Sequence, residues 1–449
     1  MSAALDAIFK AYDVRGVYPD EIDESTARLV GNAFVRFTRA PRVLVGRDAR
    51  PSGESLVAAF TEGVTLAGAD LVDLGVVSTD LCYFAAGHLD APGAMFTASH
   101  NPARYNGIKL CRAGAAPIGQ DSGLVQLKAT VAEGLLERAE EAGRVERRDL
   151  LHAFVVHVRS FVDIAALRPR RVVADTANGV GGLIVPAVLS GLPFELRVLF
   201  GELDGTFPNH PADPIQARNL VDLRREVLAT HADVGLAFDG DADRVVLVDE
   251  TAEPVSGSAT TAILARAILA RHPGETIVHN LICSKAVPEI VREAGGLPLR
   301  TRVGHSFIKE VMAESGAIFG GEHSAHYYFR DNFRADSGII AALMVLEQLS
   351  ITGRPLSELR ASVERYAGSG EINRRVDDPH AVLERVAARY AGASVDRLDG
   401  LTVDLGDWWF NLRPSNTEPL LRLNLEAPDP AECAGRVAEV LEVVGGEAD

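Results

Sequence analysis

The segment DVGLAFDGDADRVVLVD, residues 233–249, contains two short apolar runs separated by a loop of alternating aspartates. Each run has the length and the Val/Leu/Phe content of a buried strand. A strand that ends in a polar loop places that loop at an edge of the sheet, where open α/β proteins bind their ligands. The segment therefore predicts both a sheet and a candidate site beside it.

Similar apolar runs recur along the chain and alternate with longer, helix-like patterns. The further strands that we predict are 42–46, 93–97, 171–175, 276–280 and 317–320. The alternation of strand-like and helix-like segments is typical of α/β layers. A chain of 449 residues exceeds what one hydrophobic core usually supports. We therefore expect several α/β domains. We expect joints in the charge-dense, helix-like stretch 131–150, in the turn-rich segment 249–257 and in the Gly/Ser-rich segment 366–370.

The composition excludes several classes of protein. Hydrophobic residues make up 47% and charged residues 24% of the chain, which is typical of globular enzymes rather than disordered or fibrous proteins. No apolar run approaches the length of a membrane span and the N-terminus lacks a secretory signal, so we expect a cytoplasmic protein without membrane contact. A net charge of −17 disfavours nucleic-acid binding. An anionic substrate would therefore need a local cluster of Arg and Lys.

Asp239, Asp241 and Asp243 alternate in the loop DGDADR. Carboxylates at this spacing in a tight turn can converge on one hard cation, and oxygen ligands favour Mg²⁺ or Ca²⁺ over zinc. An EF-hand is excluded, because Arg244 stands where that loop requires glycine and strand-like runs flank the loop. A solvated acidic hairpin, or the aspartate nucleophile of a phosphatase, would give the same pattern.

The segment FTASHNPARYNGIKL, residues 96–110, delivers Ser99 from a predicted strand into a loop with the turn signals Asn-Pro and Asn-Gly. A serine nucleophile needs a base or a cation nearby, and His100 and Lys109 are local candidates. Taken alone, the segment is also explained by an ordinary exit from a strand, with Ser99 making a local backbone hydrogen bond.

The segment GGEHSAHYYFRD, residues 320–331, would project Glu322, Ser324 and His326 to one side if it were extended. Carboxylate, hydroxyl and imidazole groups can bind the hydroxyls of a polyol. His323 has the opposite parity, and we expect it to be structural. The alternative is a buried polar network beneath the aromatic residues that follow.

The segment RPSNTEP, residues 413–419, combines the Arg413 guanidinium with donors from Ser415, Asn416 and Thr417, a suitable cradle for phosphate. The preceding run 401–412 is typical of a hairpin that would present this loop, although two prolines around polar residues also describe a plain surface turn. A metal site, a serine, a group that binds sugar hydroxyls and a phosphate cradle together indicate sugar-phosphate chemistry.

The motif YDVRG at 12–16 precedes these four motifs in the chain. In their order along the sequence, the five motifs resemble those of the α-D-phosphohexomutase family, specifically its phosphomannomutase/phosphoglucomutase branch. The resemblance spans nearly the whole chain. It implies three related α/β layered domains and a smaller α+β C-terminal domain, which we expect at 1–150, 151–250, 251–367 and 368–449. It also implies interconversion of hexose 6-phosphate and hexose 1-phosphate, with mannose or glucose as the sugar, through a phosphoserine and a hexose 1,6-bisphosphate.

The resemblance also implies roles for the site residues. Ser99 is expected to carry the phosphoryl group and to bind Mg²⁺ together with Asp239, Asp241 and Asp243. The reacting centre is expected to contain Arg15, Lys109 and Arg244. Apart from the resemblance, the need to remove a proton from the attacking hydroxyl makes Lys109, His100 and His326 candidate catalytic proton acceptors. Contacts with the hexose phosphate are expected from Gly304, His305, Glu322, Ser324, His326, Arg413, Ser415, Asn416 and Thr417. Hexose 1,6-bisphosphate is expected to be an activator, and the protein a monomer or homodimer.

Two rival functions use the same residues. A metal-dependent sugar-phosphate phosphatase would use Asp239 as its nucleophile and release inorganic phosphate without Ser99. A noncatalytic protein would only bind sugar phosphates. The mutase interpretation requires Ser99 and the three aspartates to meet around one cation in a single cleft.

Overall fold

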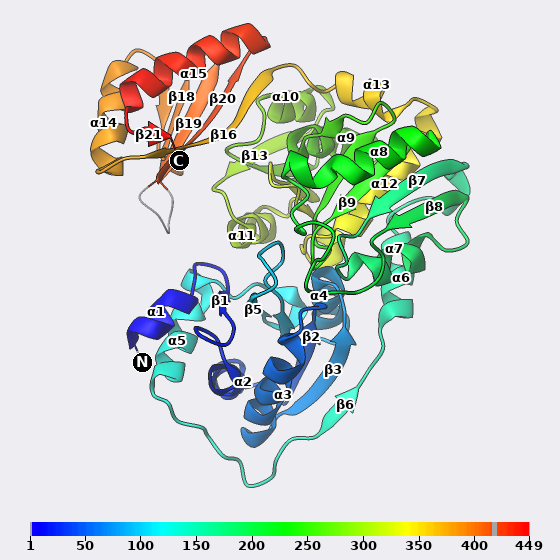
Figure 1. Cartoon of the computed structure of the whole chain (residues 1–449), viewed down its shortest axis with the longest axis vertical. Helices are drawn as coiled ribbons and strands as arrows, with labels where there is room; N and C mark the ends of the chain where they lie inside the picture. Colours follow the sequence, from blue (N-terminus) through cyan, green and yellow to red (C-terminus); the bar gives the residue numbers. More distant parts are fainter. Residues whose placement is uncertain (1, 415–419, 449) are drawn as a thin grey trace.

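The computed structural model describes residues 2–414 and 420–448, including the side chains of residues 5–304, 306–414 and 420–447. In this part of the chain the strands form four sheets, which follow one another along the sequence. Helices pack on each sheet, so each sheet with its helices forms one domain (Figure 1). The predicted α/β fold of four domains is confirmed.

Domain I has a six-stranded sheet with the order β1-β5-β4-β2-β3-β6. Helix α2 begins after Asp23, whose side chain accepts a hydrogen bond from the Thr26 backbone N–H, and it buries Val30 and Phe34. The elements are α1 (Ser2–Ile8), β1 (Val14–Val17), α2 (Glu24–Thr38), β2 (Arg42–Arg47), α3 (Gly53–Leu66), β3 (Asp70–Val76), α4 (Thr79–His88), β4 (Gly93–Phe96), β5 (Tyr105–Cys111), α5 (Leu124–Ala132) and β6 (Val145–Arg147).

Domain II has a five-stranded sheet with the order β11-β10-β9-β7-β8. Every residue of β9 and β10 is buried, as expected for strands that are apolar except for Asp249 at the end of β10. Because β11 pairs with β10, this sheet extends to Val255, past the boundary expected at 250. The elements are α6 (Leu151–Arg159), β7 (Arg170–Asp175), α7 (Gly181–Leu189), β8 (Phe194–Leu199), α8 (Val221–Thr230), β9 (Val234–Phe238), β10 (Val245–Asp249) and β11 (Pro254–Val255).

Domain III has a four-stranded sheet with the order β13-β12-β14-β15. Its helix α12 is apolar on nearly all sides and is buried accordingly. The elements are α9 (Gly257–Arg271), β12 (Thr276–Asn280), α10 (Ala286–Glu293), β13 (Leu297–Thr301), α11 (His305–Ser315), β14 (Phe319–Gly321), β15 (Tyr327–Phe329), α12 (Gly338–Thr352) and α13 (Leu356–Ala361).

Domain IV has a six-stranded sheet with the order β17-β18-β19-β20-β16-β21, in which the recorded pairs are antiparallel. Its apolar residues form a core of their own, which includes Phe410 and Val440. The elements are β16 (Ala367–Arg375), α14 (Pro379–Arg389), β17 (Ser394–Asp396), β18 (Leu401–Asp404), β19 (Trp409–Pro414), β20 (Leu420–Ala427), α15 (Pro430–Val444) and β21 (Glu447–Ala448).

The first three domains repeat one arrangement of three strands. A strand pairs in parallel with a second strand, and the second pairs with an antiparallel third that follows it in the sequence. The three examples are β2-β4-β5, β7-β9-β10 and β12-β14-β15. In each domain a sequence motif singled out above occupies the connection between the second and third strands, so the fold places three motifs at equivalent positions.

All the strands expected from apolar runs form, but two of the expected joints differ from the prediction. Helix α5 ends at Ala132, and the stretch 133–150 is mostly an exposed loop with the edge strand β6 instead of a helix. Its charged residues offer no apolar stripe that a helix could bury. The segment 366–370 runs into strand β16, whose register with β20 shifts between Gly368 and Glu371.

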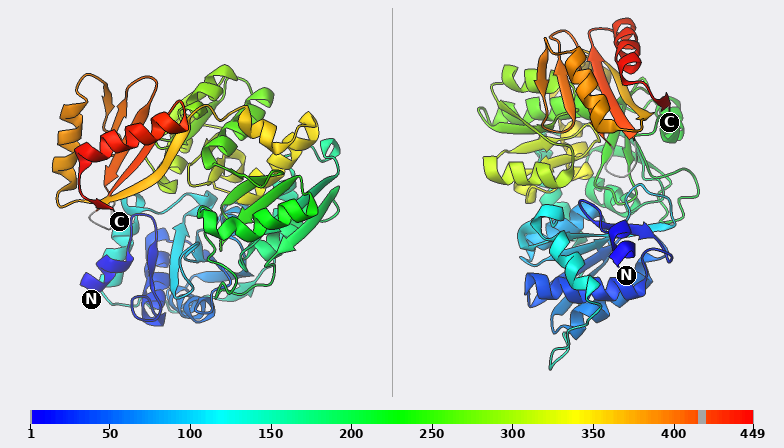
Figure 2. Two further views of the ribbon diagram at one scale, coloured as in Figure 1. Left: turned by 45° about the horizontal axis from the view of Figure 1, so that its top comes forward. Right: turned by 90° about the vertical axis from the view of Figure 1, so that its left-hand side faces the viewer.

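Domains I, II and III share one continuous hydrophobic cluster, whereas the core of domain IV is separate. Domain IV lies beside domain III in both views of Figure 2. Polar contacts join the two: Lys285 Nζ donates to Asp404 Oδ1 at 3.1 Å, and the Lys285 backbone N–H donates to Glu426 Oε2 at 2.9 Å. Domain IV is therefore the domain best able to move as a unit. Among the described residues we find no helix with the length and apolarity to cross a bilayer.

Asp80, in the first turn of α4, joins domain I to domain III. Its side chain is fully buried and accepts hydrogen bonds from Ser78 Oγ and, at 2.6 Å, from Ser337 Oγ at the start of α12. Burial raises the pKa of this carboxyl from 3.8 to about 7. Between pH 4 and pH 7 the Asp80 carboxyl is therefore protonated in the folded protein and ionised in the unfolded chain. The free energy of unfolding consequently falls as pH rises through this range.

Replacing Asp80 with asparagine should remove this part of the pH dependence. The stability of the variant relative to the parent is expected to rise between pH 4 and pH 8, by roughly 4 kcal/mol at most, since each pKa unit corresponds to about 1.4 kcal/mol. Thermal unfolding of both proteins across this range measures the difference. A constant difference in melting temperature would show that Asp80 titrates normally.

Candidate active site

The loops after β4 and β9 meet at Ser99. The Ser99 Oγ donates a hydrogen bond of 2.6 Å to Asp239 Oδ2, although 140 residues separate the two. His100 Nδ1 lies 3.2 Å and Arg244 Nη2 lies 3.4 Å from the same oxygen. Ser99 has a backbone φ of +48° and a buried side chain. This left-handed conformation is uncommon for a residue other than glycine, and it is more than an ordinary exit from a strand requires.

The acidic loop between β9 and β10 is buried and is not a solvated hairpin. Asp239 and Asp241 are 0% exposed and Asp243 is 1% exposed. Gly240 allows the two loops to approach, because a Cβ at this position would lie 2.6 Å from the carbonyl oxygen of Ser99. Arg244, which ends the loop, donates from Nε to Asp239 Oδ2 at 3.0 Å.

The three carboxylates suit a hard divalent cation. Each offers an oxygen within 4.8 Å of the others. Asp241 Oδ1 and Asp243 Oδ1 are buried and have no hydrogen-bond partner among the described residues. Burial and the neighbouring carboxylates raise the pKa of Asp239 well above its usual range, despite Arg244 beside it. A bound cation would relieve this excess of negative charge, and a donor set made only of oxygen favours Mg²⁺.

Lys109 holds two of these carboxylates in place. Its Nζ donates to Asp241 Oδ2 and to Asp243 Oδ2, both at 2.7 Å, so that the other oxygen of each carboxylate is left for a cation. Burial opposes the charge on Lys109, but the two carboxylates outweigh it and raise the pKa of the ammonium well above its ordinary value. The charged form of Lys109 is therefore stabilised beside the two aspartates.

His100 is the neutral group beside Ser99. Burial, together with the charges of Arg244 and Arg15, lowers the pKa of its imidazole to about 2. Arg15 reaches the same loop from β1: its Nη1 donates to Asn101 Oδ1 at 2.7 Å and its Nε donates to Asp13 Oδ2 at 3.1 Å. The structure thus gathers cationic and neutral donors around the Ser99 oxygen.

The loop between β14 and β15 is a tight turn, so the extended conformation expected for residues 322–326 is wrong. Ala325 has a φ of +64°, and the Glu322 backbone N–H donates to the carbonyl oxygen of His326 at 3.0 Å. The turn still joins Ser324 Oγ and His326 Nδ1, 2.9 Å apart. Glu322 is 2% exposed and accepts hydrogen bonds from Asn280 and Tyr328, as in the buried network considered as the alternative.

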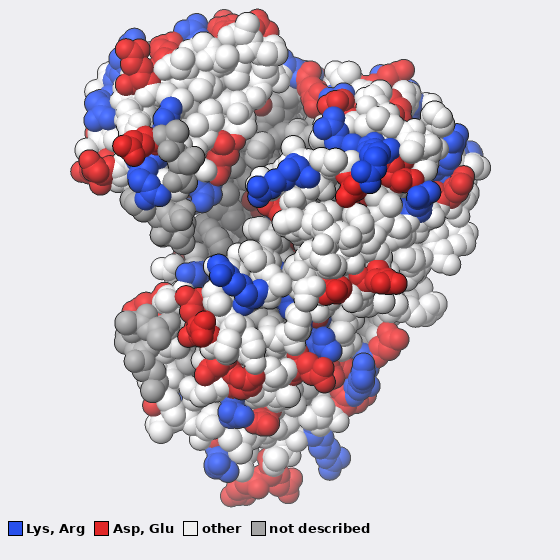
Figure 3. All heavy atoms as spheres, in the orientation of Figure 1, with Lys and Arg blue, Asp and Glu red and all other residues white. Residues whose placement is uncertain are grey.

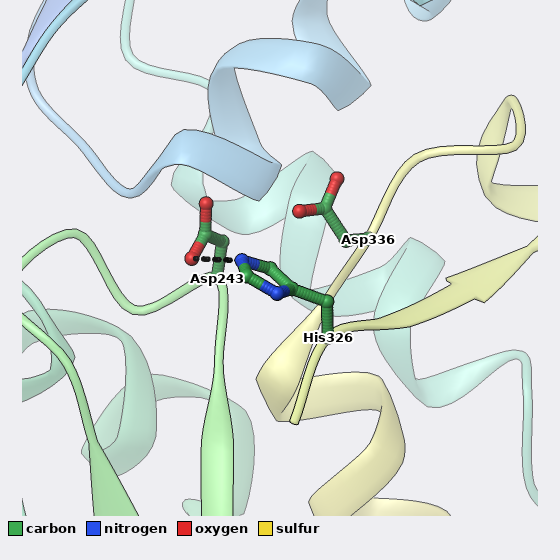
Figure 4. A group of neighbouring side chains, drawn as sticks. All are labelled: Asp243, His326 and Asp336. Carbon is green, nitrogen blue, oxygen red and sulfur yellow. Dashed lines mark ion pairs between the residues drawn. The ribbon is translucent and has the colours of Figure 1, made fainter. Parts of the chain in front are cut away.

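His326 connects this turn to the acidic loop between β9 and β10. Its backbone forms a β-bridge with Arg244, and its Nε2 lies 3.8 Å from Asp243 Oδ1. Figure 4 shows the imidazole between the carboxylates of Asp243 and Asp336. Loops from domains I, II and III therefore meet at one place.

The fourth loop leaves β19 at Arg413. Arg413 Nη2 lies 3.8 Å from Glu371 Oε2, on the side of the sheet that also carries Arg422. The predictions for Ser415, Asn416 and Thr417 lie outside the described residues. The space-filling view shows Lys and Arg side chains on both sides of the hollow between domain IV and domain I (Figure 3), the kind of local basic cluster that the overall negative charge requires for an anionic substrate.

The chain matches four sequence models of phosphoglucomutase/phosphomannomutase: α/β/α domain I over residues 6–134, α/β/α domain II over 152–253, α/β/α domain III over 256–366 and the C-terminal domain over 371–443. The chain belongs to the phosphoglucomutase/phosphomannomutase family. The predictions of this family and of a mutase enzyme are thereby confirmed.

Relatives of the family align over nearly the full length. The chain is 41% identical over 443 residues to "Phosphohexose mutases" of Xanthomonas campestris pv. campestris (strain B100), covering 98% of this chain and 99% of the relative. It is 39% identical over 448 residues to a phosphomannomutase of Salmonella montevideo, covering 97% and 98%. The crystal structure of a phosphoglucomutase/phosphomannomutase family protein from Burkholderia thailandensis superimposes with a TM-score of 0.89 at 32% identity, covering 99% of this chain and 98% of that one.

Two residues near the acidic loop were given no role from the sequence. Thr79, at the start of α4, donates from Oγ1 to Asp241 Oδ2 at 2.6 Å. Its position between Ser78 and Asp80 signals only a helix start. Lys309 is 2% exposed, pairs with Asp336 Oδ1 at 2.8 Å and lies over the Tyr83 ring at 3.9 Å. The chain has only five lysines, and this scarcity was the available signal.

The segment 304–309 also joins domain III to domain I. Gly304 has a φ of +132°, and a Cβ there would lie 2.5 Å from the Tyr12 hydroxyl. Tyr12 belongs to the YDVRG motif and packs edge-on against Phe307. His305 begins helix α11, and its side chain lies outside the described part of the structure.

Proposed function

We propose that this enzyme interconverts the 6-phosphate and the 1-phosphate of a hexose, mannose or glucose, by passing a phosphoryl group through Ser99. The observation that carries the proposal is the 2.6 Å contact between Ser99 Oγ and Asp239, beside two buried carboxylate oxygens that have no hydrogen-bond partner among the described residues. Relatives named phosphomannomutase support the sugar class.

Asp239, Asp241 and Asp243 would hold Mg²⁺, with an oxygen of phosphorylated Ser99 as a further ligand. When bound, this ion would neutralise charge on the transferring phosphoryl group. A phosphoserine adds about −1.5 to −2 charges at neutral pH. The chain's own cations near the serine are Arg244, Lys109 and Arg15, which fix the surrounding carboxylates and loop.

In the first half-reaction, a free hydroxyl of the hexose phosphate attacks the phosphorus of phosphoserine 99. A new P–O bond to the sugar forms, the bond from phosphorus to Ser99 Oγ breaks, and hexose 1,6-bisphosphate results. The attacking hydroxyl loses a proton and Oγ gains one. After the bisphosphate turns over, the reverse reaction returns its other phosphoryl group to Ser99. The bisphosphate would also reload enzyme that had lost its phosphoryl group, which is the activator role.

Lys109, His100 and His326 are the candidate groups for proton transfer. His100 Nδ1 lies 3.2 Å from Oγ, within hydrogen-bond reach, but its lowered pKa makes the imidazole a weak proton acceptor. His326, from the adjacent loop, is a candidate for the proton of the attacking hydroxyl. Geometry and in-line positioning supply most of the acceleration in such a transfer.

Substrate binding would use the phosphate that does not react. Because one cleft must accept the sugar in two orientations, we expect Arg413 and the loop 415–417 to hold this phosphate, while Glu322, Ser324 and His326 with the segment at Gly304 and His305 contact the sugar. Asn280 and Tyr328 already hold the Glu322 carboxylate, so its orientation is fixed before substrate binds.

Replacing Arg413 with glutamine should weaken substrate binding. Loss of a charged hydrogen-bond donor to phosphate costs about 1.5–3 kcal/mol, so KM for the hexose phosphate is expected to rise roughly 10- to 100-fold. Steady-state kinetics measure this. Arg397→Gln, which removes an exposed ion pair with Glu384 in the same domain, is the matched control. An unchanged KM would count against the phosphate-binding role of Arg413.

A coupled assay with mannose 1-phosphate, glucose 1-phosphate and glucosamine 1-phosphate, together with a phosphate-release assay, tests the proposal. We expect conversion of mannose or glucose 1-phosphate to the 6-phosphate, stimulated by a trace of hexose 1,6-bisphosphate and without inorganic phosphate. Stoichiometric phosphate release would favour the phosphatase. Binding without any conversion would favour the noncatalytic protein.

A further inference from the structure

Arg50 lies directly behind the loop that carries Ser99. It follows β2 in the segment RDARPSG, residues 47–53, which contains none of the four motifs. Its side chain is 0% exposed and is among the largest fully buried side chains of the described chain. A buried guanidinium is costly unless its donors are satisfied, so the arrangement of its partners shows what it does.

All five N–H donors of the guanidinium are used. Nε donates to Asp48 Oδ2 at 3.0 Å. The other four donate to backbone carbonyl oxygens of one loop: Nη1 to Pro102 at 2.8 Å and Tyr105 at 2.9 Å, and Nη2 to Ser99 at 2.8 Å and Asn101 at 2.7 Å. A lysine ammonium has three donors on one atom and cannot span these four carbonyls together with the carboxylate.

The same cluster fixes both peptide groups of Ser99. The carbonyl oxygen of Ser99 accepts from Arg50, while its N–H donates to Thr97 Oγ1 at 2.8 Å. The Thr97 hydroxyl donates in turn to Asp48 Oδ2 at 2.8 Å. Ser99 is thus held in its left-handed conformation, φ +48°, from both sides, and this conformation turns Oγ toward Asp239.

Domain II closes over the guanidinium. The ring of Phe207 covers Arg50, with Cζ 5.1 Å from the ring centroid. Nearby, Gly205 allows the backbones to touch, because a Cβ there would lie 2.3 Å from the carbonyl oxygen of Ala49. The Arg50 side chain is therefore shielded from solvent, and the domain that supplies the acidic loop also covers the support of Ser99.

We propose that Arg50 is a positioning residue for phosphoryl transfer, which fixes the backbone of Ser99 so that Oγ faces the metal-binding aspartates. This inference rests on the proposed function. Arg50 acts from behind the loop, since its recorded contacts are to Asp48, backbone carbonyl oxygens and Phe207 and do not include Oγ. Loss of Arg50 should slow both half-reactions alike and leave binding of the remote phosphate unchanged.

The test compares Arg50→Lys and Arg50→Ala with the parent enzyme and with Arg47→Lys, a neighbouring control. For Arg50→Lys we expect kcat, and the rate at which hexose 1,6-bisphosphate phosphorylates Ser99, to fall by a similar factor of roughly 10², while KM changes less than about threefold. For Arg50→Ala we expect added guanidinium ion at nondenaturing concentration to restore activity, and the control should match the parent.

Arg50→Lys with parental kcat would overturn the proposal, and so would a loss confined to KM or a folded Arg50→Ala variant that guanidinium does not rescue. If neither Arg50 variant folds, Thr97→Val provides the test, because it removes the hydroxyl that accepts from the Ser99 backbone N–H. We expect this variant to have a lower kcat and an unchanged KM. A parental kcat for Thr97→Val would overturn the proposal. A parent enzyme without phosphoserine turnover would refute the proposed function instead, so the two failures are distinguishable.

Discussion

Replacing Ser99 with alanine is expected to lower mutase turnover by at least about 10⁴-fold, the scale of loss seen when a covalent nucleophile is removed. The phosphoryl group would have no acceptor on the enzyme, although Asp239, Lys109 and Arg244 would keep the remaining contacts of the site. The coupled assay at saturating hexose 1-phosphate and bisphosphate measures this loss. The melting temperature should change little, because the three aspartates keep their contacts with Lys109 and Arg244.

The matched control is Ser55→Ala, which removes a partly buried hydroxyl from α3 of the same domain and should leave turnover unchanged. A Ser99→Ala variant that retained a tenth or more of the parental turnover would refute the phosphoserine assignment. Retained phosphate release by that variant would instead favour the phosphatase with Asp239 as its nucleophile.

The second large effect is expected from the metal ligands. Asp241→Ala should abolish Mg²⁺ binding and lower turnover at least about 10³-fold, because the phosphoserine would face the remaining carboxylates without the ion that neutralises them. It would also leave Lys109 with one carboxylate partner instead of two. Calorimetric titration with Mg²⁺ and assays after chelation measure the two losses. Activity that resisted thorough chelation would contradict the metal assignment.

Thr79→Val should affect the same site as Asp241→Ala, but less strongly. It removes the hydroxyl that orients Asp241 but leaves all three carboxylates in place. Loss of such an outer hydrogen bond typically costs 10- to 100-fold in metal affinity. We therefore expect activity that falls at low Mg²⁺ and returns at high Mg²⁺, whereas Asp241→Ala should not recover. Identical behaviour of the two variants would show that Thr79 serves the fold and not the metal site.

Much of the fold could be predicted because several of its strands, such as β4, β9, β10 and β14, are short runs that are buried on both faces. The run before Asp239 and the run after it became β9 and β10 for this reason. The stretch 131–150 was misassigned because charge density is compatible with a helix but does not stabilise one without an apolar face. The turn at 322–326 was misassigned because polar side chains at alternate positions are typical of an extended backbone. Instead, Ala325 adopts a positive φ and the backbone turns.

The candidate site was harder to predict, because its contacts join distant parts of the chain. Local spacing indicated a cation site at the aspartates, but only the resemblance to a family placed Ser99 beside them. Arg50 and Thr79 could not be found in this way, since each contacts a site loop that is 49 or more residues away in the sequence. Their roles become visible only when the loops of the first two domains meet.

The most direct test of the account is the fate of the phosphoryl group on the enzyme. Dephosphorylated enzyme is mixed with hexose 1,6-bisphosphate, and the modified residue is located by peptide mass spectrometry before and after hexose 1-phosphate is added. We expect one phosphoryl group on Ser99 that then leaves as newly formed hexose 1,6-bisphosphate. A phosphoryl group on Asp239, or one that leaves only as inorganic phosphate, would contradict the account.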